Sequence, residues 1–217
     1  QNYHPEDTVV ALSGHFTDAD LQYICKLFER MMGSGRNQIE PAQYQSSVVV
    51  RPKDIEQNHL CLGFRGLALL DDRRYAYQLM NGILGGGMSS RLFQTVREQN
   101  GLCYSICSFP SSYIDTGMFS IYVGLSQEQE QKAVGLMKEV LHEFCENGPT
   151  EAELCRCREQ VKSNMLMGLE STNARMNHLG RFELFTDCVM SPDELTAAYD
   201  AVTVQKVQEL ANVIFCF

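Results

Sequence analysis

Residues 84–104 read LGGGMSSRLFQTVREQNGLCY and carry more structural signals than any other stretch of this chain. Gly85, Gly86 and Gly87 end an apolar run and predict a loop that can approach a ligand or another backbone closely. A serine just after them can cap a short helix, and Gly101 ends that helix before a strand. The stretch therefore predicts a helix–loop–helix–strand unit.

Two polar side chains in this stretch could carry chemistry. Arg97 is predicted on the polar side of the short helix, and Tyr104 follows seven residues later on the strand. A guanidinium and a phenol held together can both donate hydrogen bonds to a carbonyl or a developing oxyanion without a metal ion. The alternative is a solvated Arg97 and a Tyr104 packed on the sheet, and the residue types alone favour that alternative.

On either side of this stretch, the predicted strands come in neighbouring pairs between helices. This order predicts an α+β fold, with an antiparallel or mixed sheet covered by helices, rather than a doubly wound parallel sheet. The polar stretch up to about Gln45 predicts a linker. The predicted strands are residues 8–13, 47–51, 59–65, 102–109 and 118–125, and the first two long helices are residues 17–32 and 71–84.

Capping residues mark the starts of several helices. A Ser or Thr followed three residues later by Glu or Gln matches the capping box, and Pro is favoured at the first helical position. The matches are Ser126 with Gln129, Thr150 with Glu153, and Ser191 with Glu194, with Pro192 at the first position, and Thr17 and Thr203 as single caps.

Composition excludes several classes of function. With 18 Lys+Arg against 27 Asp+Glu the net charge is -9, and no basic run is present, so we expect no nucleic-acid partner. No apolar stretch approaches the roughly 20 residues of a membrane span, so we expect no membrane partner. The nine cysteines are interpreted as reduced, buried small hydrophobes, which favours a cytoplasmic location.

Metal ligands in a recognisable pattern are missing from the sequence. His142, Glu143 and Glu146 form His-Glu-x-x-Glu, which lacks the second His of a zincin helix. Cys155 and Cys157 are two residues apart and would point in different directions on a helix. We therefore predict no metal site in this chain, and no Gly-x-Ser-x-Gly elbow or phosphate loop is present either.

Several stretches together resemble the pitrilysin/insulinase family of zinc metallopeptidases, and specifically its C-terminal half. They are LGGGMSSRLFQTVREQNGLCYS, YIDTGMFSIYVG and the helical segment that includes NGPTEAELCRCREQVKSNML. The opening NYHPEDTVVALSGHFTDADLQYICKLFERMMG resembles the last strand and helix of the family's first half. The resemblance implies that residues 1–35 are the tail of an N-terminal half and that residues 36–217 are a C-terminal, substrate-binding half.

The family resemblance also implies a function. In the family, two α+β halves close around an unfolded peptide, and the N-terminal half holds zinc through His-x-x-Glu-His. The C-terminal half supplies an Arg and a Tyr seven residues apart, which match Arg97 and Tyr104 here, and Gly85, Gly86 and Gly87 could let the peptide pass. This chain lacks the zinc motif, so the resemblance implies the non-zinc half of a metalloendopeptidase, inactive alone.

The expected partners follow from that interpretation. They are the N-terminal zinc-binding half and unfolded peptide substrates, with zinc in the parent enzyme and no cofactor in this chain. Self-association into a homodimer is a further partnership that an exposed apolar inner surface would allow. The alternative function is a catalytically silent scaffold or interaction subunit of the same fold.

Overall fold

The structure is a computed structural model that describes residues 4–31, 40–186 and 188–216. It divides into two units, which are described separately. Unit 1 comprises Gln1–Pro41 and Ser163–Leu195, and unit 2 comprises Ala42–Lys162 and Thr196–Phe217. Within the described ranges, no helix is both long enough and apolar enough to cross a lipid bilayer.

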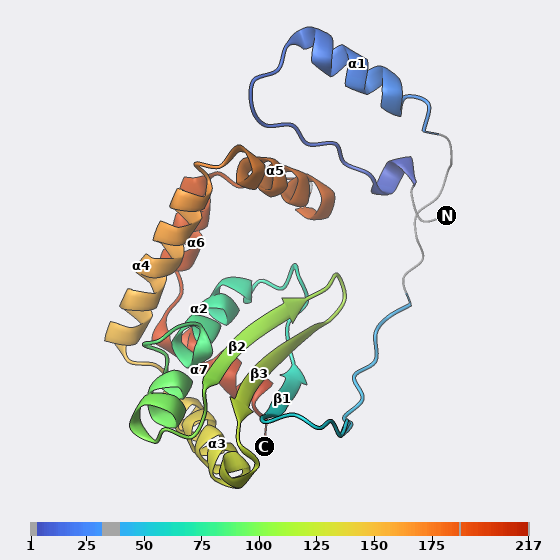
Figure 1. The fold of residues 1–217 in the computed structure, drawn as a ribbon. Helices are drawn as coiled ribbons and strands as arrows, with labels where there is room; N and C mark the ends of the chain where they lie inside the picture. Colours follow the sequence, from blue (N-terminus) through green and yellow to red (C-terminus); the bar gives the residue numbers. More distant parts are fainter. Residues whose placement is uncertain (1–3, 32–39, 187, 217) are drawn as a thin grey trace. The chain divides into compact units, whose positions relative to one another are not determined.

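Unit 2 contains an antiparallel sheet of three strands, in which β3 (Gly117–Leu125) lies between β1 (Asn58–Arg65) and β2 (Ser105–Ser112). β2 and β3 form a hairpin whose turn is closed by a 2.8 Å hydrogen bond from the Tyr113 amide to the Thr116 carbonyl. Helices cover this sheet (Figure 1). The predicted α+β class is confirmed.

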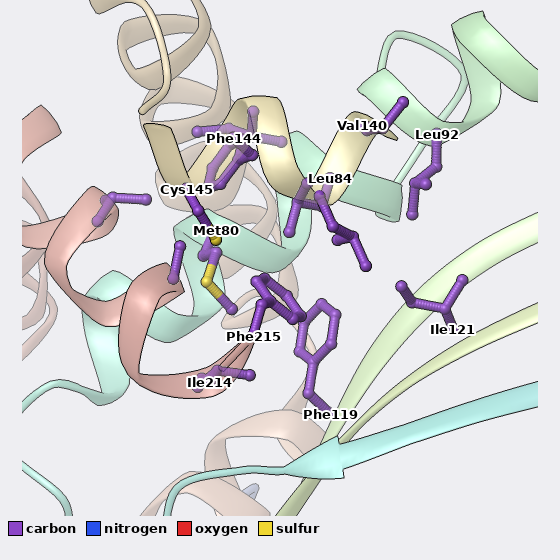
Figure 2. Close-up of a cluster of buried hydrophobic side chains, with 14 of the residues drawn as sticks. Met80, Leu84, Leu92, Phe119, Ile121, Val140, Phe144, Cys145, Ile214 and Phe215 are labelled. Carbon is purple, nitrogen blue, oxygen red and sulfur yellow. The ribbon is translucent and has the colours of Figure 1, made fainter. Parts of the chain in front are cut away.

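One face of the sheet joins helices α2 (Arg74–Gly85), α3 (Glu130–Asn147) and α7 (Val204–Ile214) in a single hydrophobic cluster. Figure 2 shows side chains of these helices meeting those of β3. Burying one large apolar side chain contributes roughly 1.5–3 kcal/mol, so the cluster holds the helices on the sheet. Its largest fully buried side chains are Phe119, Phe144, Phe215, Leu79, Met80, Leu84, Leu92, Ile121, Leu125, Met137, Leu141 and Leu154.

Two predicted capping boxes are confirmed in unit 1 and unit 2. The hydroxyl of Thr150 accepts from the Glu153 amide at 3.2 Å, and the Glu153 carboxylate accepts from the Thr150 amide at 2.8 Å. The same reciprocal pair joins Ser191 and Glu194. Such caps stabilise a helix by about 1 kcal/mol each. They precede α4 (Glu151–Gly168) and α6 (Pro192–Asp200) respectively.

Of the other three predicted helix starts, two are confirmed and one is wrong. Thr17 and Thr203 cap α1 (Asp18–Phe28) and α7 through their side chains, as expected. The prediction of a capping box at Ser126 is wrong, because the Ser126 side chain makes no cap hydrogen bond. The chain first forms the 3₁₀ turn η3 (Gln127–Gln129). α3 then begins at Glu130.

Unit 1 contains the short turn η1 (Pro5–Asp7), α1, α5 (Thr172–Thr186) and parts of α4 and α6. Neither α1 nor α5 carries a buried residue within the described structure. The first helix was predicted to reach residue 32, but α1 ends at Phe28. Residues 32–39 lie outside the described residues, so the domain boundary at residues 35/36 stays a prediction.

Two predicted strands do not form. Residues 8–13 and 47–51 have no regular secondary structure and are not part of the sheet formed by the described residues. Val48, Val49 and Val50 are 93%, 74% and 81% exposed. β-branched residues favour a strand only when a neighbouring strand supplies hydrogen bonds and packing, and none of the described strands does so here.

The interpretation of the cysteines as buried hydrophobes is largely wrong. Only Cys145 and Cys157 are buried, whereas Cys25, Cys61 and Cys155 are exposed. Cys188 and Cys216 are exposed as well, and the remaining two are half-buried. Apolar neighbours in sequence did not indicate which side of each element faces the core.

Candidate functional site

The glycine run ends helix α2 and lies against strand β2. A Cβ at Gly85 would lie 2.5 Å from the backbone nitrogen of Ser108, so Gly85 is needed for close packing of helix on strand. Gly86 and Gly87 are exposed, and a Cβ at Gly87 would meet nothing within 4 Å. The last two glycines therefore present accessible backbone, whereas the first is part of the packed interior.

Arg97 lies in the π-helical segment η2 (Phe93–Gln99). Its carbonyl accepts from the Gly101 amide at 2.9 Å, and the Leu102 amide donates to the Val96 carbonyl at 3.1 Å. Gly101 has a φ of +59°, the left-handed conformation that glycine adopts without strain. This turn explains why β2 begins at Ser105 rather than at residue 102, as the sequence predicted.

Arg97 and Tyr104 are brought together by this turn. The guanidinium Cζ of Arg97 lies 5.7 Å from the centroid of the Tyr104 ring. The Tyr104 amide donates to the Gly124 carbonyl at 3.1 Å, which ties its backbone to the sheet. The Arg97 side chain is 39% exposed and Tyr104 is 74% exposed, so both can donate to a bound molecule.

Phe93 is the residue of this site whose role the sequence did not reveal. As an apolar residue in the same short helix as Leu92 and Val96, it would ordinarily be assigned to one buried helix face with them. Those two are fully buried, but Phe93 is only half-buried, and the Arg97 Cζ lies 4.8 Å from its ring centroid. The i, i+4 spacing of an aromatic residue and an arginine was the available signal. The glycine run is not part of these ring contacts.

An ion pair anchors the segment that leads into η2. The Arg91 guanidinium donates from Nε and from a terminal nitrogen to the two carboxylate oxygens of Glu153, both at 2.8 Å. It also donates to the Gly148 carbonyl at 3.0 Å. The hydrogen bonds from Arg91 lower the pKa of Glu153 to about 2, against the opposing effect of burial. The start of α4 is thereby fixed to the segment that carries Arg97.

Zinc ligands are not assembled by the described residues. No group of three or more His, Cys, Asp or Glu side chains in the described structure could hold a metal ion. His142 and Glu146 lie 3.7 Å apart on α3, with side chains that are 69% and 63% exposed, which is an ordinary surface pair. A groove of about 550 Å³ between α2, α6 and α7 contains neither Arg97 nor Tyr104.

The sequence of the chain is similar to one domain family and to several longer proteins. Residues 1–161 match the profile of the peptidase M16 inactive domain. The uncharacterized zinc protease YmxG of Bacillus subtilis is 37% identical over 214 residues, which is 98% of this chain and 52% of that protein. An uncharacterized zinc protease of Streptomyces coelicolor is 41% identical over 157 residues, 72% of this chain and 34% of that protein. The chain thus spans about half the length of these relatives or less.

Solved structures share the fold. A peptidase M16 inactive domain from Pseudomonas fluorescens has a TM-score of 0.76 at 23% identity, covering 92% of this chain and 48% of its own. A chain of complex III2 from Candida albicans has a TM-score of 0.79 at 20% identity. The match covers 92% of this chain and 50% of that chain. At these identities the likeness concerns the fold alone.

Proposed function

Because this chain belongs to the M16 peptidases and corresponds to their inactive domain, we propose that it is the non-zinc half of a zinc-dependent metalloendopeptidase. In this proposal it binds extended peptides, helps to stabilise the transition state of their hydrolysis, and does not hydrolyse them alone. The observation that carries the proposal is the exposed pairing of Arg97 with Tyr104.

Arg97 and Tyr104 would act as hydrogen-bond donors to one peptide carbonyl. As water adds to the carbonyl carbon, negative charge gathers on the oxygen. Donors that are already in place then bind the transition state more strongly than the ground state. The guanidinium offers several N–H donors, and the phenol hydroxyl adds one more donor beside it.

The zinc ion belongs, in this proposal, to the half of the parent protein that this chain does not include. The relatives are named zinc proteases, while the described residues offer no set of zinc ligands. When bound in the other half, zinc would polarise the scissile carbonyl and activate water. The residues of this chain would hold and orient the peptide.

The peptide would bind as an added strand. β1 and β2 are the edges of the three-stranded sheet, and an edge strand has outward amides and carbonyls that can pair with an extended peptide. Gly86 and Gly87 are exposed, lie shortly before the segment that carries Arg97, and would let a peptide backbone pass closely. Recognition of this kind depends little on side chains, so sequence preference should be loose.

Zinc content and fluorogenic-peptide hydrolysis test the division into halves. Both are measured on this chain alone and after addition of the upstream half. We expect no activity from the chain alone and zinc-dependent activity after mixing. Stoichiometric zinc with turnover in the isolated chain would refute the proposal. In the full-length protein, Arg97→Ala should lower kcat/KM by about 10²–10³, and an unchanged value would remove Arg97 from the site.

A catalytically silent scaffold subunit is the second candidate. The observation that favours it is the match of residues 1–161 to a domain family described as inactive. It predicts that the upstream half lacks His-x-x-Glu-His and that partners bind without turnover. Absence of activity in both the isolated chain and the mixture would support it.

A further inference from the structure

The Arg97 guanidinium lies over two aromatic rings. Its Cζ atom is 4.8 Å from the centroid of the Phe93 ring and 5.7 Å from that of the Tyr104 ring. A guanidinium near an aromatic face is attracted by the negative potential of the ring. Both rings therefore influence where this charged group points.

The two rings are held with different firmness. Phe93 is half-buried and packs against the hydrophobic core. Tyr104 is 74% exposed. Since a ring packed into the core has few alternative rotamers, Phe93 is the fixed surface on which the guanidinium rests.

The backbone places these side chains on one side of η2. Phe93 is its first residue and Arg97 its fifth, and side chains four residues apart on a helix are neighbours. Segments of π-helix are rare and occur frequently at functional sites. This spacing lets the Arg97 side chain lie back across Phe93 instead of extending into solvent.

Glu98 constrains the Arg97 guanidinium less than the Phe93 ring does. Its Oε1 is 3.8 Å from Arg97 Nε, and the two side chains are 52% and 39% exposed. Ion pairs this exposed contribute little, because water screens the charges and both side chains lose freedom. The aromatic contact is therefore the stronger constraint on the guanidinium.

We propose that Phe93 is a positioning residue of the peptide site, whose ring face holds the Arg97 guanidinium beside Tyr104 so that both donors reach one carbonyl. The role rests on the proposed function, since Phe93 acts through Arg97. A leucine at position 93 would keep an apolar side chain against the core but would present no aromatic face.

Peptide hydrolysis by the full-length protein gives the first readout. Phe93→Leu should lower kcat by about 3- to 10-fold with little change in KM, because the donor is misplaced where charge develops. Phe93→Tyr keeps the ring face and should restore the rate. Phe28→Leu is the matched control, since Phe28 is 46% exposed on α1 and is not one of the rings that contact Arg97.

Alkylation of Cys103 in the same protein reports where Arg97 lies. Burial raises the pKa of the Cys103 thiol, and the positive charge of Arg97 opposes that rise. If Phe93→Leu releases Arg97, Cys103 should react about 2- to 5-fold more slowly with iodoacetamide near pH 8. Arg97→Ala should have the same effect, and adding Phe93→Leu to it should change nothing further. Cys107, whose pKa is raised by burial and by Cys61, is the internal reference.

The outcomes separate the two proposals. Normal kinetics and normal Cys103 alkylation in Phe93→Leu would overturn the positioning role. So would an alkylation change that persists in the Arg97→Ala background, because it would arise from packing. The expected alkylation pattern together with an unchanged kcat/KM in Arg97→Ala would support the placement of Arg97 by Phe93 and refute the proposed function.

Discussion

Gly85 and Ser108 meet so closely that a Cβ on the glycine would lie 2.5 Å from both the backbone nitrogen and the hydroxyl oxygen of the serine. The Ser108 hydroxyl in turn donates to the Asn81 side-chain oxygen at 2.8 Å. Helix α2 is therefore fixed to strand β2 by contact between backbones, and the contact leaves no space for a side chain. Two of the three glycines in the run lie outside this contact.

Substitution of Gly85 should separate helix from strand. Gly85→Ala is expected to lower the free energy of unfolding by about 1–3 kcal/mol, because the extra methyl group forces α2 away from β2. Gly87→Ala is the matched control, since a Cβ there meets nothing within 4 Å, and it should change stability by less than about 0.5 kcal/mol. Urea unfolding followed by circular dichroism measures both. Equal effects at the two positions would contradict this account of the contact.

The Arg91–Glu153 pair should make stability depend on acid pH. The pKa of Glu153 is lowered from 4.5 to about 2, chiefly by hydrogen bonds from Arg91. Because the folded-state pKa is depressed, the stabilisation is present above pH 4.5 and is lost as pH falls from there to about 2. A shift of this size corresponds to about 3 kcal/mol.

Glu153→Gln tests this dependence. The variant should be less stable at pH 7, because a partly buried guanidinium loses its charged partner. It should also lose less stability than the parent protein between pH 4.5 and 2. Urea unfolding at a series of pH values gives both quantities, and parallel pH profiles for the two proteins would contradict the assignment.

Removal of the Tyr104 hydroxyl should separate its two contributions. Tyr104→Phe keeps the ring beside Arg97 but loses the donor, so kcat/KM of the full-length protein should fall by about 10- to 100-fold. Tyr104→Leu also loses the ring, so its kcat/KM should be lower still. Tyr113→Phe is the control, since Tyr113 is 64% exposed at the β2–β3 turn. Equal activity of Tyr104→Phe and the parent would exclude the phenol as a donor.

The two cysteines of α4 should differ in reactivity. Burial raises the pKa of Cys157 to about 11, and its thiol donates to the Leu79 carbonyl at 3.5 Å. Cys155 is exposed. At pH 8 Cys155 should be alkylated readily and Cys157 only on unfolding, which mass spectrometry of the modified peptides can measure. Rapid labelling of both would contradict the orientation of α4.

Local signals predicted the helices well and the strands incompletely. Thr17, Thr150, Ser191 and Thr203 cap helices as expected, because a cap depends on residues within one turn. The start of β2 was misplaced because Gly101 closes a turn whose hydrogen bonds occupy the following amides. Residues 8–13 and 47–51 show strand-forming composition, yet pairing depends on a partner that no local pattern reveals.

Part of the candidate site could also be predicted. The spacing of Arg97 and Tyr104, with Gly101 between them, indicated their approach once the family resemblance was recognised. The role of Phe93 was hidden, because an apolar residue next to Leu92 and Val96 is normally assigned to the core. Its ring packs against the core and also contacts the Arg97 guanidinium, and a sequence pattern does not indicate both contacts of one side chain.

The exposed run Val48–Val50 has a consequence for handling the protein. Three adjacent β-branched residues, preceded by two uncharged serines, form a short segment of the composition that adds to other strands and seeds aggregation. Arg51, Pro52 and Lys53 follow directly, and charge and proline at the end of such a segment act as gatekeepers. Replacing Arg51, Pro52 and Lys53 with small uncharged residues should therefore increase aggregation of the protein as its concentration rises.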